Sequence, residues 1–180
     1  MRWVGLVRDT LAMPVLTPAT ADFLDSAPAR VVVEVPVLAP IDACWNLIAD
    51  QASWVQWFDG MSAVKATPWQ WTEPGQKRTV TVNGINVDEV AISIKPKVEY
   101  AFTIAKWPLF VATKAAEAIR LEDRTNGGSA RTLLTYIGAF EYTAMGERTA
   151  KILDKQLSDA WGAAFRQLGE MANRTGAHHG

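Results

Sequence analysis

Residues 61 to 142 alternate between apolar and polar side chains almost without a break, and short turn sequences divide them into segments. A period of two is typical of β-strands with one buried face. The strongest turn signal is Asn83-Gly84, because both residues tolerate positive φ and suit a two-residue hairpin. The expected strands cover residues 62–67, 75–82, 85–94, 98–104, 111–122 and 131–142. Consecutive strands joined by such short turns must pair antiparallel.

The alternation also predicts which side chains share one side of each strand. The sets expected to share a side are Arg78, Val80 and Val82 in one strand, Val90, Ile92 and Ile94 in the next, and Val98, Tyr100, Phe102 and Ile104 in the third. In residues 111–122, Lys114, Arg120 and Glu122 mark the side expected to be solvated. The opposite side is apolar apart from Thr113 and Glu117.

A further strand precedes this region. From Arg30 on, the valines at positions 31, 33, 35 and 37 alternate with other residues, which again predicts a β-strand. Pro36 lies inside it and favours an edge position in the sheet, because proline cannot donate a ladder hydrogen bond. Two short helices are expected next, one over residues 41–50 and one around Trp54 and Trp57, and Asp59-Gly60 ends the second.

The chain after these strands is expected to form one long helix, from about Met145 to Asn173. Its apolar residues recur at helical spacing and are Leu153, Leu157, Ala160, Trp161, Ala164, Phe165, Leu168 and Met171. A wide apolar stripe of this kind suits a helix packed across a sheet. Seven antiparallel strands with helices on one side make an α+β arrangement. A strongly curved sheet and one long helix can enclose a cavity.

Residues 1–29 are interpreted as an N-terminal extension that is partly helical, and residues 30–176 as the domain itself. Trp3, Leu6, Val7 and Leu11 recur at helical spacing, and Pro14 and Pro18 end the pattern. One more helical turn is expected within residues 19–24. The first helix could pack on the outside of the domain, cover a site as a lid, or form a homodimer contact.

Composition narrows the possible functions. The net charge is −1, and the sequence lacks the basic stripe that is typical of nucleic-acid binding. Cys44 is the single cysteine, which excludes an intramolecular disulfide and suits a reducing compartment. No apolar stretch approaches the roughly 20 residues of a transmembrane helix. Arg8 and Asp9 interrupt the apolar N-terminal stretch and argue against a signal peptide. We therefore expect a cytoplasmic protein.

The residues suited to catalysis are few. His178 and His179, the two histidines, lie at the extreme C-terminus, which argues against a catalytic triad or a histidine-rich metal site. Metal-binding spacings, phosphate-binding glycine loops and nucleophile elbows are all missing. We expect neither a metal nor a cofactor. An enzyme built from this sequence would depend on carboxylates, Tyr, Lys, Arg or bound water.

Several short motifs occur in an order that is similar to one known superfamily. Residues 35–40 form a strand that ends in Ala-Pro and leads into a helix with Cys44-Trp45 and a final Asp50, followed by the aromatic pair of Trp54-Val55-Gln56-Trp57. The later motifs are Asn83-Gly84, Asp88-Glu89-Val90, Lys95-Pro96, Gly127-Gly128, Leu134-Thr135-Tyr136 and Phe140-Glu141. Over residues 30–173 the chain resembles the START-like, or SRPBCC, superfamily of polyketide cyclases, dehydrases and lipid-transport proteins. The resemblance implies a helix-grip fold, in which a curved sheet wraps the C-terminal helix around a cavity for a small hydrophobic ligand.

Glu117 and two tyrosines are the candidates for acid–base chemistry. By strand parity Glu117 points toward the cavity, where loss of solvation would raise the pKa of its carboxyl. A shifted parity, or a position at the rim beside a Lys or Arg, is the alternative. Tyr100 and Tyr136 lie on apolar strand faces, where their hydroxyls could bind a ligand carbonyl or simply bond to backbone or water.

The expected ligand-contacting residues come from the strands and from the C-terminal helix. They are Tyr100, Phe102, Ile104, Glu117, Tyr136, Phe140, Leu157, Trp161 and Phe165. The leading hypothesis is a carrier of a lipid-like or polycyclic molecule. The alternatives are a polyketide cyclase or dehydratase that uses Glu117 or a tyrosine, and a protein-interaction domain. A hollow with two or more convergent polar groups would favour an enzyme. A purely apolar hollow would favour a carrier, and a filled core would favour an interaction domain.

Overall fold

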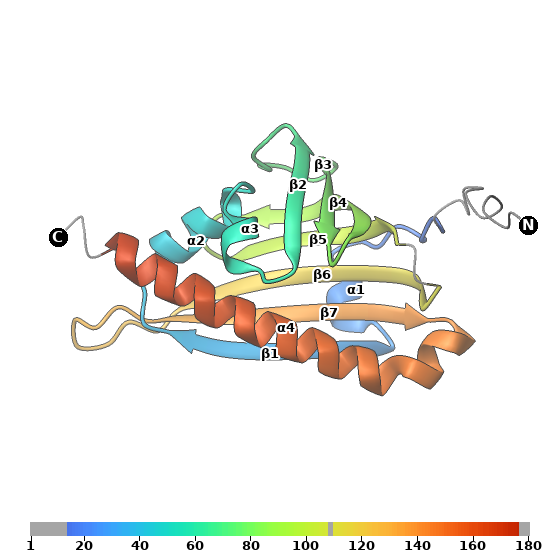
Figure 1. Ribbon diagram of the computed structural model, residues 1–180. Coiled ribbons are helices and arrows are strands. Elements are labelled where there is room, and N and C mark those ends of the chain that lie inside the picture. Colours follow the sequence, from blue (N-terminus) through green and yellow to red (C-terminus); the bar gives the residue numbers. More distant parts are fainter. Residues whose placement is uncertain (1–13, 108–109, 177–180) are drawn as a thin grey trace, which may run out of the picture.

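The computed structural model describes residues 14–107 and 110–176, which form one antiparallel sheet with helices against both of its faces (Figure 1). In chain order the elements are α1 (Phe23–Ser26), β1 (Ala29–Val37), α2 (Ile41–Ala49), α3 (Trp54–Trp57), β2 (Met61–Thr67), β3 (Lys77–Val82), β4 (Ile85–Lys95), β5 (Glu99–Lys106), β6 (Ala112–Asp123), β7 (Thr132–Tyr142) and α4 (Ala144–Gly176). The two short helices after β1, the seven strands and the long C-terminal helix confirm the predicted α+β helix-grip fold.

The strands follow one another through the sheet in the order β1-β7-β6-β5-β4-β3-β2. Strands β2 to β7 therefore form a meander, and β1 extends the sheet by pairing with β7. The edge position of β1 confirms the interpretation of Pro36. Asn83 and Gly84 have φ values of 50° and 77°, which gives the β3–β4 hairpin its predicted two-residue turn.

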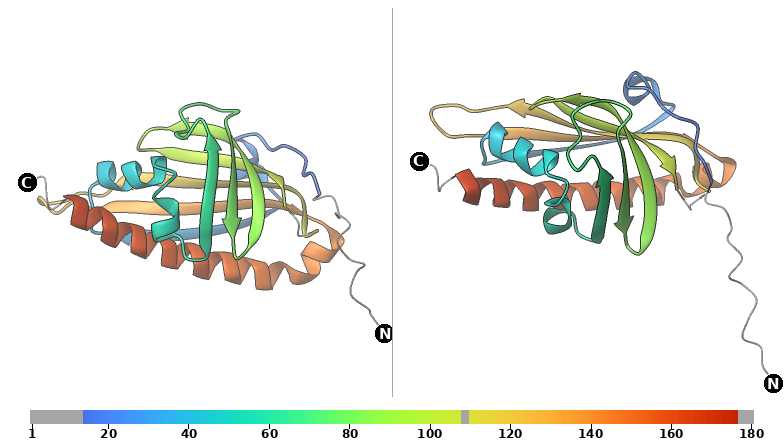
Figure 2. Two further views of the ribbon diagram at one scale, coloured as in Figure 1. Left: turned by 45° about the horizontal axis from the view of Figure 1, so that its top comes forward. Right: turned by 90° about the horizontal axis from the view of Figure 1, so that it is seen from above.

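Helix α4 lies along one face of the sheet, which we call the inner face, and α1 lies on the opposite, outer face (Figure 2). The residues of α4 that are buried on the inner side include Trp161, Ala164, Phe165, Leu168 and Ala172. A Cβ atom on Gly169 would lie 2.5 Å from a methyl group of Val37, so glycine allows α4 to approach β1 closely. Helices α2 and α3 share this inner side with α4 (Figure 2).

The outer face is covered by the chain that precedes β1. The backbone N–H of Leu16 donates to the carbonyl of Ala105 at 3.0 Å, and that of Thr17 donates to the carbonyl of Thr113 at 2.8 Å. Phe23 and Leu24 are buried against alanines of β5, β6 and β7. The turn predicted within residues 19–24 starts at Thr20, whose carbonyl accepts a hydrogen bond from the N–H of Phe23 at 3.1 Å, and it continues as α1; Val15 to Thr17 before it lie along the sheet. The helix predicted over residues 1–12 lies outside the described residues.

One predicted strand face is wrong in part. Val90 and Ile92 were expected to share a side with Ile94, but a β-bulge between Ala91 and Ser93 shifts the register of β4 against β5. Ile92 packs against the outer cluster, whereas Ile94 packs against the inner one. A bulge adds one residue and so inverts the alternation beyond it. Glu89 precedes this bulge and points inward with Ile85, Val87 and Ala91, paired with Ile104 of β5.

The part of the chain that the structure describes contains no helix that is long and apolar enough to cross a membrane.

Candidate functional site

A cavity of about 200 Å³ lies between the inner face of the sheet and α4. Its walls come from α3, from strands β2 to β6, from the β5–β6 connection and from α4. The lining residues are Trp54, Phe58, Met61, Val80, Val82, Asn83, Ile85, Val87, Glu89, Phe102, Ile104, Trp107, Glu117, Leu157 and Trp161. The volume falls between the roughly 150 Å³ of an engineered cavity that binds benzene and the roughly 300–1,000 Å³ of pockets for drug-sized ligands. The cavity therefore suits a compact molecule.

Aromatic rings form much of the wall. Phe58 and Trp161 meet edge to face, with 4.8 Å between the ring centroids, and Trp54 meets Trp161 at 6.3 Å. Phe102 and Trp107 add two more rings from the sheet and the following connection. The space between these rings remains open because they pack against one another and against the sheet rather than across the cavity.

Glu117 projects into the cavity from β6. Its Cα atom pairs with Phe102 on one side and Gly138 on the other, and its strand neighbours on the same side, Ala115 and Ile119, are buried. The surface that Glu117 retains faces this cavity. Burial, reinforced by the charge of Glu89, raises the pKa of the Glu117 carboxyl to about 8, while the Tyr136 hydroxyl and Arg78 oppose the rise. Much of Glu117 is thus protonated at neutral pH.

Tyr136 lies beside Glu117, and Gly138 makes room for it. A Cβ atom on Gly138, the residue opposite Glu117, would lie 2.6 Å from the Tyr136 hydroxyl. The ring of Tyr136 stacks on Trp161 at 4.4 Å. Its hydroxyl is near enough to Glu117 for each group to influence the pKa of the other, but it makes no hydrogen bond of normal geometry with the described residues. The hydroxyl is therefore available to an oxygen or nitrogen atom of a bound molecule or water that reaches it.

Glu89, which lines the cavity, forms a buried ion pair with Arg78. Nε of Arg78 donates to Oε2 of Glu89 at 2.5 Å, and the Arg78 side chain has no exposed surface. Its guanidinium lies 4.0 Å from the ring of Trp54, 4.8 Å from Trp71 and 4.9 Å from Phe102. Burial raises the pKa of Glu89, and the Arg78 charge opposes that rise. Both Nη atoms of Arg78 have no partner among the described residues.

Sequence reasoning missed this ion pair, although a signal for it existed. Arg78 was placed on the same side as Val80 and Val82, which is the inward side. The Asn83-Gly84 hairpin sets Val82 opposite Ile85, and counting back along the ladder places Arg78 opposite Glu89. A basic residue on an apolar strand face, with an acidic residue opposite, is the pattern of a buried ion pair.

Five of the nine residues expected to contact a ligand line the cavity: Phe102, Ile104, Glu117, Leu157 and Trp161. The other four, Tyr100, Tyr136, Phe140 and Phe165, are fully buried and do not line it. Tyr100 stacks on Trp71 at 5.5 Å, Phe140 stacks on Tyr142 at 5.4 Å, and Phe165 packs against Trp161 at 5.5 Å. These residues fill the space behind the wall instead.

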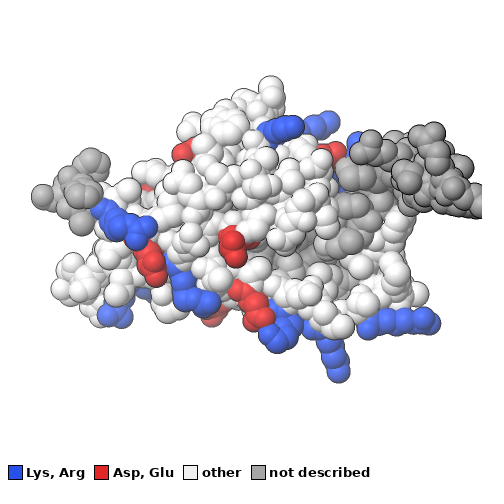
Figure 3. All heavy atoms as spheres, in the orientation of Figure 1, with Lys and Arg blue, Asp and Glu red and all other residues white. Residues whose placement is uncertain are grey.

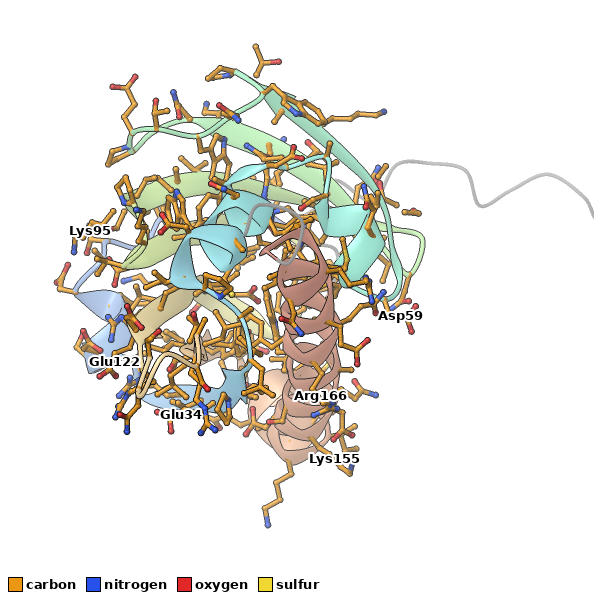
Figure 4. All side chains as sticks on the ribbon, turned by 90° about the vertical axis from the view of Figure 1, so that its left-hand side faces the viewer. Glu34, Asp59, Lys95, Glu122, Lys155 and Arg166 are labelled. Atoms are coloured by element: carbon orange, nitrogen blue, oxygen red, sulfur yellow. The ribbon has the colours of Figure 1, made fainter. Side chains whose placement is uncertain are left out.

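Apart from Glu99, which is buried on the outer face, the charged residues described elsewhere in the chain lie at the periphery. The labelled side chains Glu34, Lys95, Glu122, Lys155 and Arg166 all lie on the outside of the domain (Figure 4). On the face shown in Figure 3, charges of both signs are scattered among larger uncharged areas. Within residues 14–107 and 110–176, no group of three or more His, Cys, Asp or Glu side chains is arranged to hold a metal ion.

Comparison with known proteins places the chain in a family. Residues 28–170 match the model of the family described as polyketide cyclase / dehydrase and lipid transport. No curated protein matches the sequence.

Solved structures share the fold at low sequence identity. XoxI from Bacillus cereus is 20% identical with a TM-score of 0.66, over 84% of this chain and 99% of its own. The Zhui aromatase/cyclase from Streptomyces is 19% identical with a TM-score of 0.65, over 84% of this chain and 98% of its own. The di-domain aromatase/cyclase StfQ of the steffimycin biosynthetic pathway is 13% identical with a TM-score of 0.60, over 82% of this chain and 52% of its own. The chain therefore belongs to the polyketide cyclase / dehydrase and lipid transport family, within the START-like superfamily that its sequence resembles.

Proposed function

We propose that the protein binds a small apolar molecule with one or two rings in the cavity between the sheet and α4. The cavity itself carries this proposal, since twelve of the fifteen lining residues that the structure describes are apolar or aromatic and three, Asn83, Glu89 and Glu117, are polar. Concave, mainly apolar sites with a few polar groups are typical of small-molecule binding. An open hollow in place of a filled core favours ligand binding over a protein-interaction domain.

Filling the cavity tests this function. Val87 lines the cavity from β4, whereas Val32 of β1 is exposed on the other side of the sheet. We expect Val87→Trp to weaken binding of an uncharged two-ring fluorescent probe such as 2-naphthol by about tenfold or more, because the new indole occupies the site. Val32→Trp is the matched control and should bind like the wild type. Equal binding by both variants would place the probe elsewhere and contradict the proposal.

Acid–base chemistry on the bound molecule is a second candidate, favoured by Glu117 with Tyr136 beside it. A carboxyl whose pKa lies near 8 can donate a proton to a ligand carbonyl oxygen, and its carboxylate can take one from the adjacent carbon. This keto–enol exchange balances without a cofactor, because the ketone gains one proton at oxygen and loses one from carbon. The names of two structural relatives, both aromatase/cyclases, support chemistry of this kind.

Proton exchange separates a carrier from an enzyme. We expect the protein to speed exchange of deuterium into the α-carbon of a bicyclic ketone such as tetralone, as measured by NMR in D₂O. Glu117→Gln should abolish the acceleration and leave binding of the uncharged probe nearly unchanged. Glu122→Gln, on the same strand but 58% exposed at its side chain, is the control and should exchange normally. Exchange at the buffer rate in the wild type would favour a carrier.

A further inference from the structure

The ionisable side chains in the described lining of the cavity are all acidic. Its described lining contains two carboxyl groups, Glu89 and Glu117, and the Asn83 amide, but no Lys, Arg or His. The remaining lining residues are apolar or aromatic, and five of them present rings. Among the residues that the structure describes, a charged ligand that enters this space therefore meets carboxyl oxygens and aromatic rings but no accessible cation.

Arg78 does not supply the missing positive charge. Its side chain is fully buried outside the lining, its Nε bonds to Glu89, and the rings of Trp54 and Phe102 lie against its guanidinium. The pair with Glu89 is neutral overall, so within the described lining Glu117 is the carboxyl that has no basic partner among residues 14–107 and 110–176. The groups that influence Glu117 are Glu89 from β4, Arg78 from β3 and Tyr136 from β7. Helix α4 contributes Leu157 and Trp161, neither of which titrates.

The aromatic wall favours a positively charged ligand, as the carboxyl groups do. The face of an aromatic ring is electron-rich and attracts cations, most strongly when water is excluded. Trp54, Phe102 and Trp161 are almost completely buried around the cavity. The hydroxyl of Tyr136, buried behind Glu117 and without a partner among the described residues, can donate a hydrogen bond to the Glu117 carboxylate when an ammonium group pairs with it.

We propose that the cavity selects its ligand by charge: it takes a small aromatic molecule that carries a basic amine, with Glu117 as the partner of the amine, and it rejects carboxylates. This inference rests on the proposed binding function. An ammonium group beside the Glu117 carboxylate brings no net charge into the cavity, whereas a carboxylate would add an uncompensated negative charge close to Glu89 and Glu117. Burying an unpaired charge is strongly unfavourable.

Pairing of the amine with Glu117 predicts how many protons are released when the amine binds. In the empty cavity below about pH 8, both Glu117 and a free alkylamine are protonated. The bound pair shares a single proton, so one proton is released to solvent on binding. Affinity for the amine should therefore rise about tenfold per pH unit up to about pH 8, and then level off until the amine itself loses its proton.

Three probes of equal size test the proposal: naphthylmethylamine, naphthylmethanol and naphthoate. Isothermal titration calorimetry in buffers of different ionisation enthalpy gives both the Kd and the number of protons released. At pH 7.5 we expect the amine to bind about tenfold more tightly than the alcohol, and the carboxylate to bind at least about tenfold more weakly than the alcohol. We expect about three-quarters of a proton released for the amine, because Glu117 is about three-quarters protonated at this pH, and none for the alcohol.

Glu117→Gln removes the proposed partner of the amine. This variant should lose the proton release and the pH dependence, and it should bind the amine no more tightly than it binds the alcohol. Glu122→Gln, at an exposed position of the same strand, should retain the proton release, the pH dependence and the preference for the amine. Equal or tighter binding of the carboxylate, or an amine preference that survives in Glu117→Gln, would overturn the charge selection. Binding of none of the three probes would overturn the proposed function itself, so the two failures are distinguishable.

Discussion

Glu99 and Glu117 lie on the adjacent strands β5 and β6, yet their carboxyl groups have opposite properties because they point to opposite faces of the sheet. On the outer face, Glu99 accepts hydrogen bonds from Ser93 at 2.6 Å, from Arg120 at 2.9 Å and from Lys95 at 3.2 Å. On the inner face, Glu117 has a tyrosine hydroxyl nearby and a second carboxyl, Glu89, as a like-charged neighbour.

The pKa values of the two groups follow from these partners. Burial works to raise the pKa of Glu99, but the hydrogen bonds from Ser93, Arg120 and Lys95 outweigh it and hold that pKa below its usual value. Burial raises the pKa of Glu117 to about 8, because no comparable set of donors faces it. Loss of solvation acts on both carboxyls, and the arrangement of donors decides which one remains charged. On the outer face, Glu99 thus stays charged and bonds to its neighbours. On the inner face, Glu117 is largely protonated at neutral pH and has no basic partner among the described residues.

The largest expected effect concerns the ion pair of the inner face. Arg78→Met leaves the Glu89 carboxyl buried without its partner, and we expect a loss of about 3–5 kcal/mol in the free energy of unfolding. Urea denaturation monitored by tryptophan fluorescence measures the loss.

The double variant Arg78→Met/Glu89→Gln is the control. It removes both charges and should recover most of the lost stability, because replacing both partners of a buried pair is often close to neutral. A loss below about 1 kcal/mol in the single variant would show that the inner face tolerates unpaired charge as easily as the outer face does.

A somewhat smaller effect is expected at Gly138. Its Cβ in Gly138→Ala would lie 2.6 Å from the Tyr136 hydroxyl and 2.8 Å from an edge atom of Phe140. Overpacking of this kind costs about 1–3 kcal/mol, again measured by denaturation. Adding Tyr136→Phe removes the first clash and should restore part of the stability. If Gly138→Ala is fully stable, Tyr136 is not held against the sheet as the structure indicates.

The pH dependence of stability distinguishes the two carboxyls directly. Because the folded-state pKa of Glu117 is raised above its ordinary 4.5, the folded state holds the extra proton between about pH 4.5 and 8. The wild type should lose stability relative to Glu117→Gln as the pH rises through this range, by at most about 1.4 kcal/mol per pH unit.

Glu99 should show the opposite sign. Its pKa is held below 4.5, so its contribution is present above about pH 4.5 and is lost as the pH falls through the lowered pKa. Denaturation curves of the wild type, Glu117→Gln and Glu99→Gln between pH 3 and pH 9 measure both trends. Parallel curves for the two variants would contradict the distinction between the faces.

The smallest effect is expected at Arg120, which joins Glu99 to Asp25 of α1 on the outer face. Its side chain is 35% exposed, so water screens the pairs and Arg120→Met should cost about 1 kcal/mol or less. The loss should shrink further in high salt. Hydrogen exchange should become faster around α1, and unchanged exchange there would show that Phe23 and Leu24 hold the helix without the ion pairs.

The sequence by itself determined the order of the strands, the hairpin at Asn83-Gly84, the edge position of β1 and the long C-terminal helix. These features depend on local periodicity and turn chemistry, which a single sequence displays. The inward direction of Glu117 also follows locally, because its strand is regular from Glu117 to Asp123 and the alternation of side chains is not interrupted.

Only the tertiary structure decided which inward side chains meet a cavity and which fill the core. Ile94 points inward although Ile92 points outward, because a bulge shifts β4 against β5, and local alternation does not reveal a bulge. Tyr100, Phe140 and Phe165 share the apolar patterns of Phe102 and Trp161, yet they lie behind the wall. A cavity exists where side chains from several distant elements fail to meet, and this depends on packing in three dimensions, which periodicity along the chain does not encode.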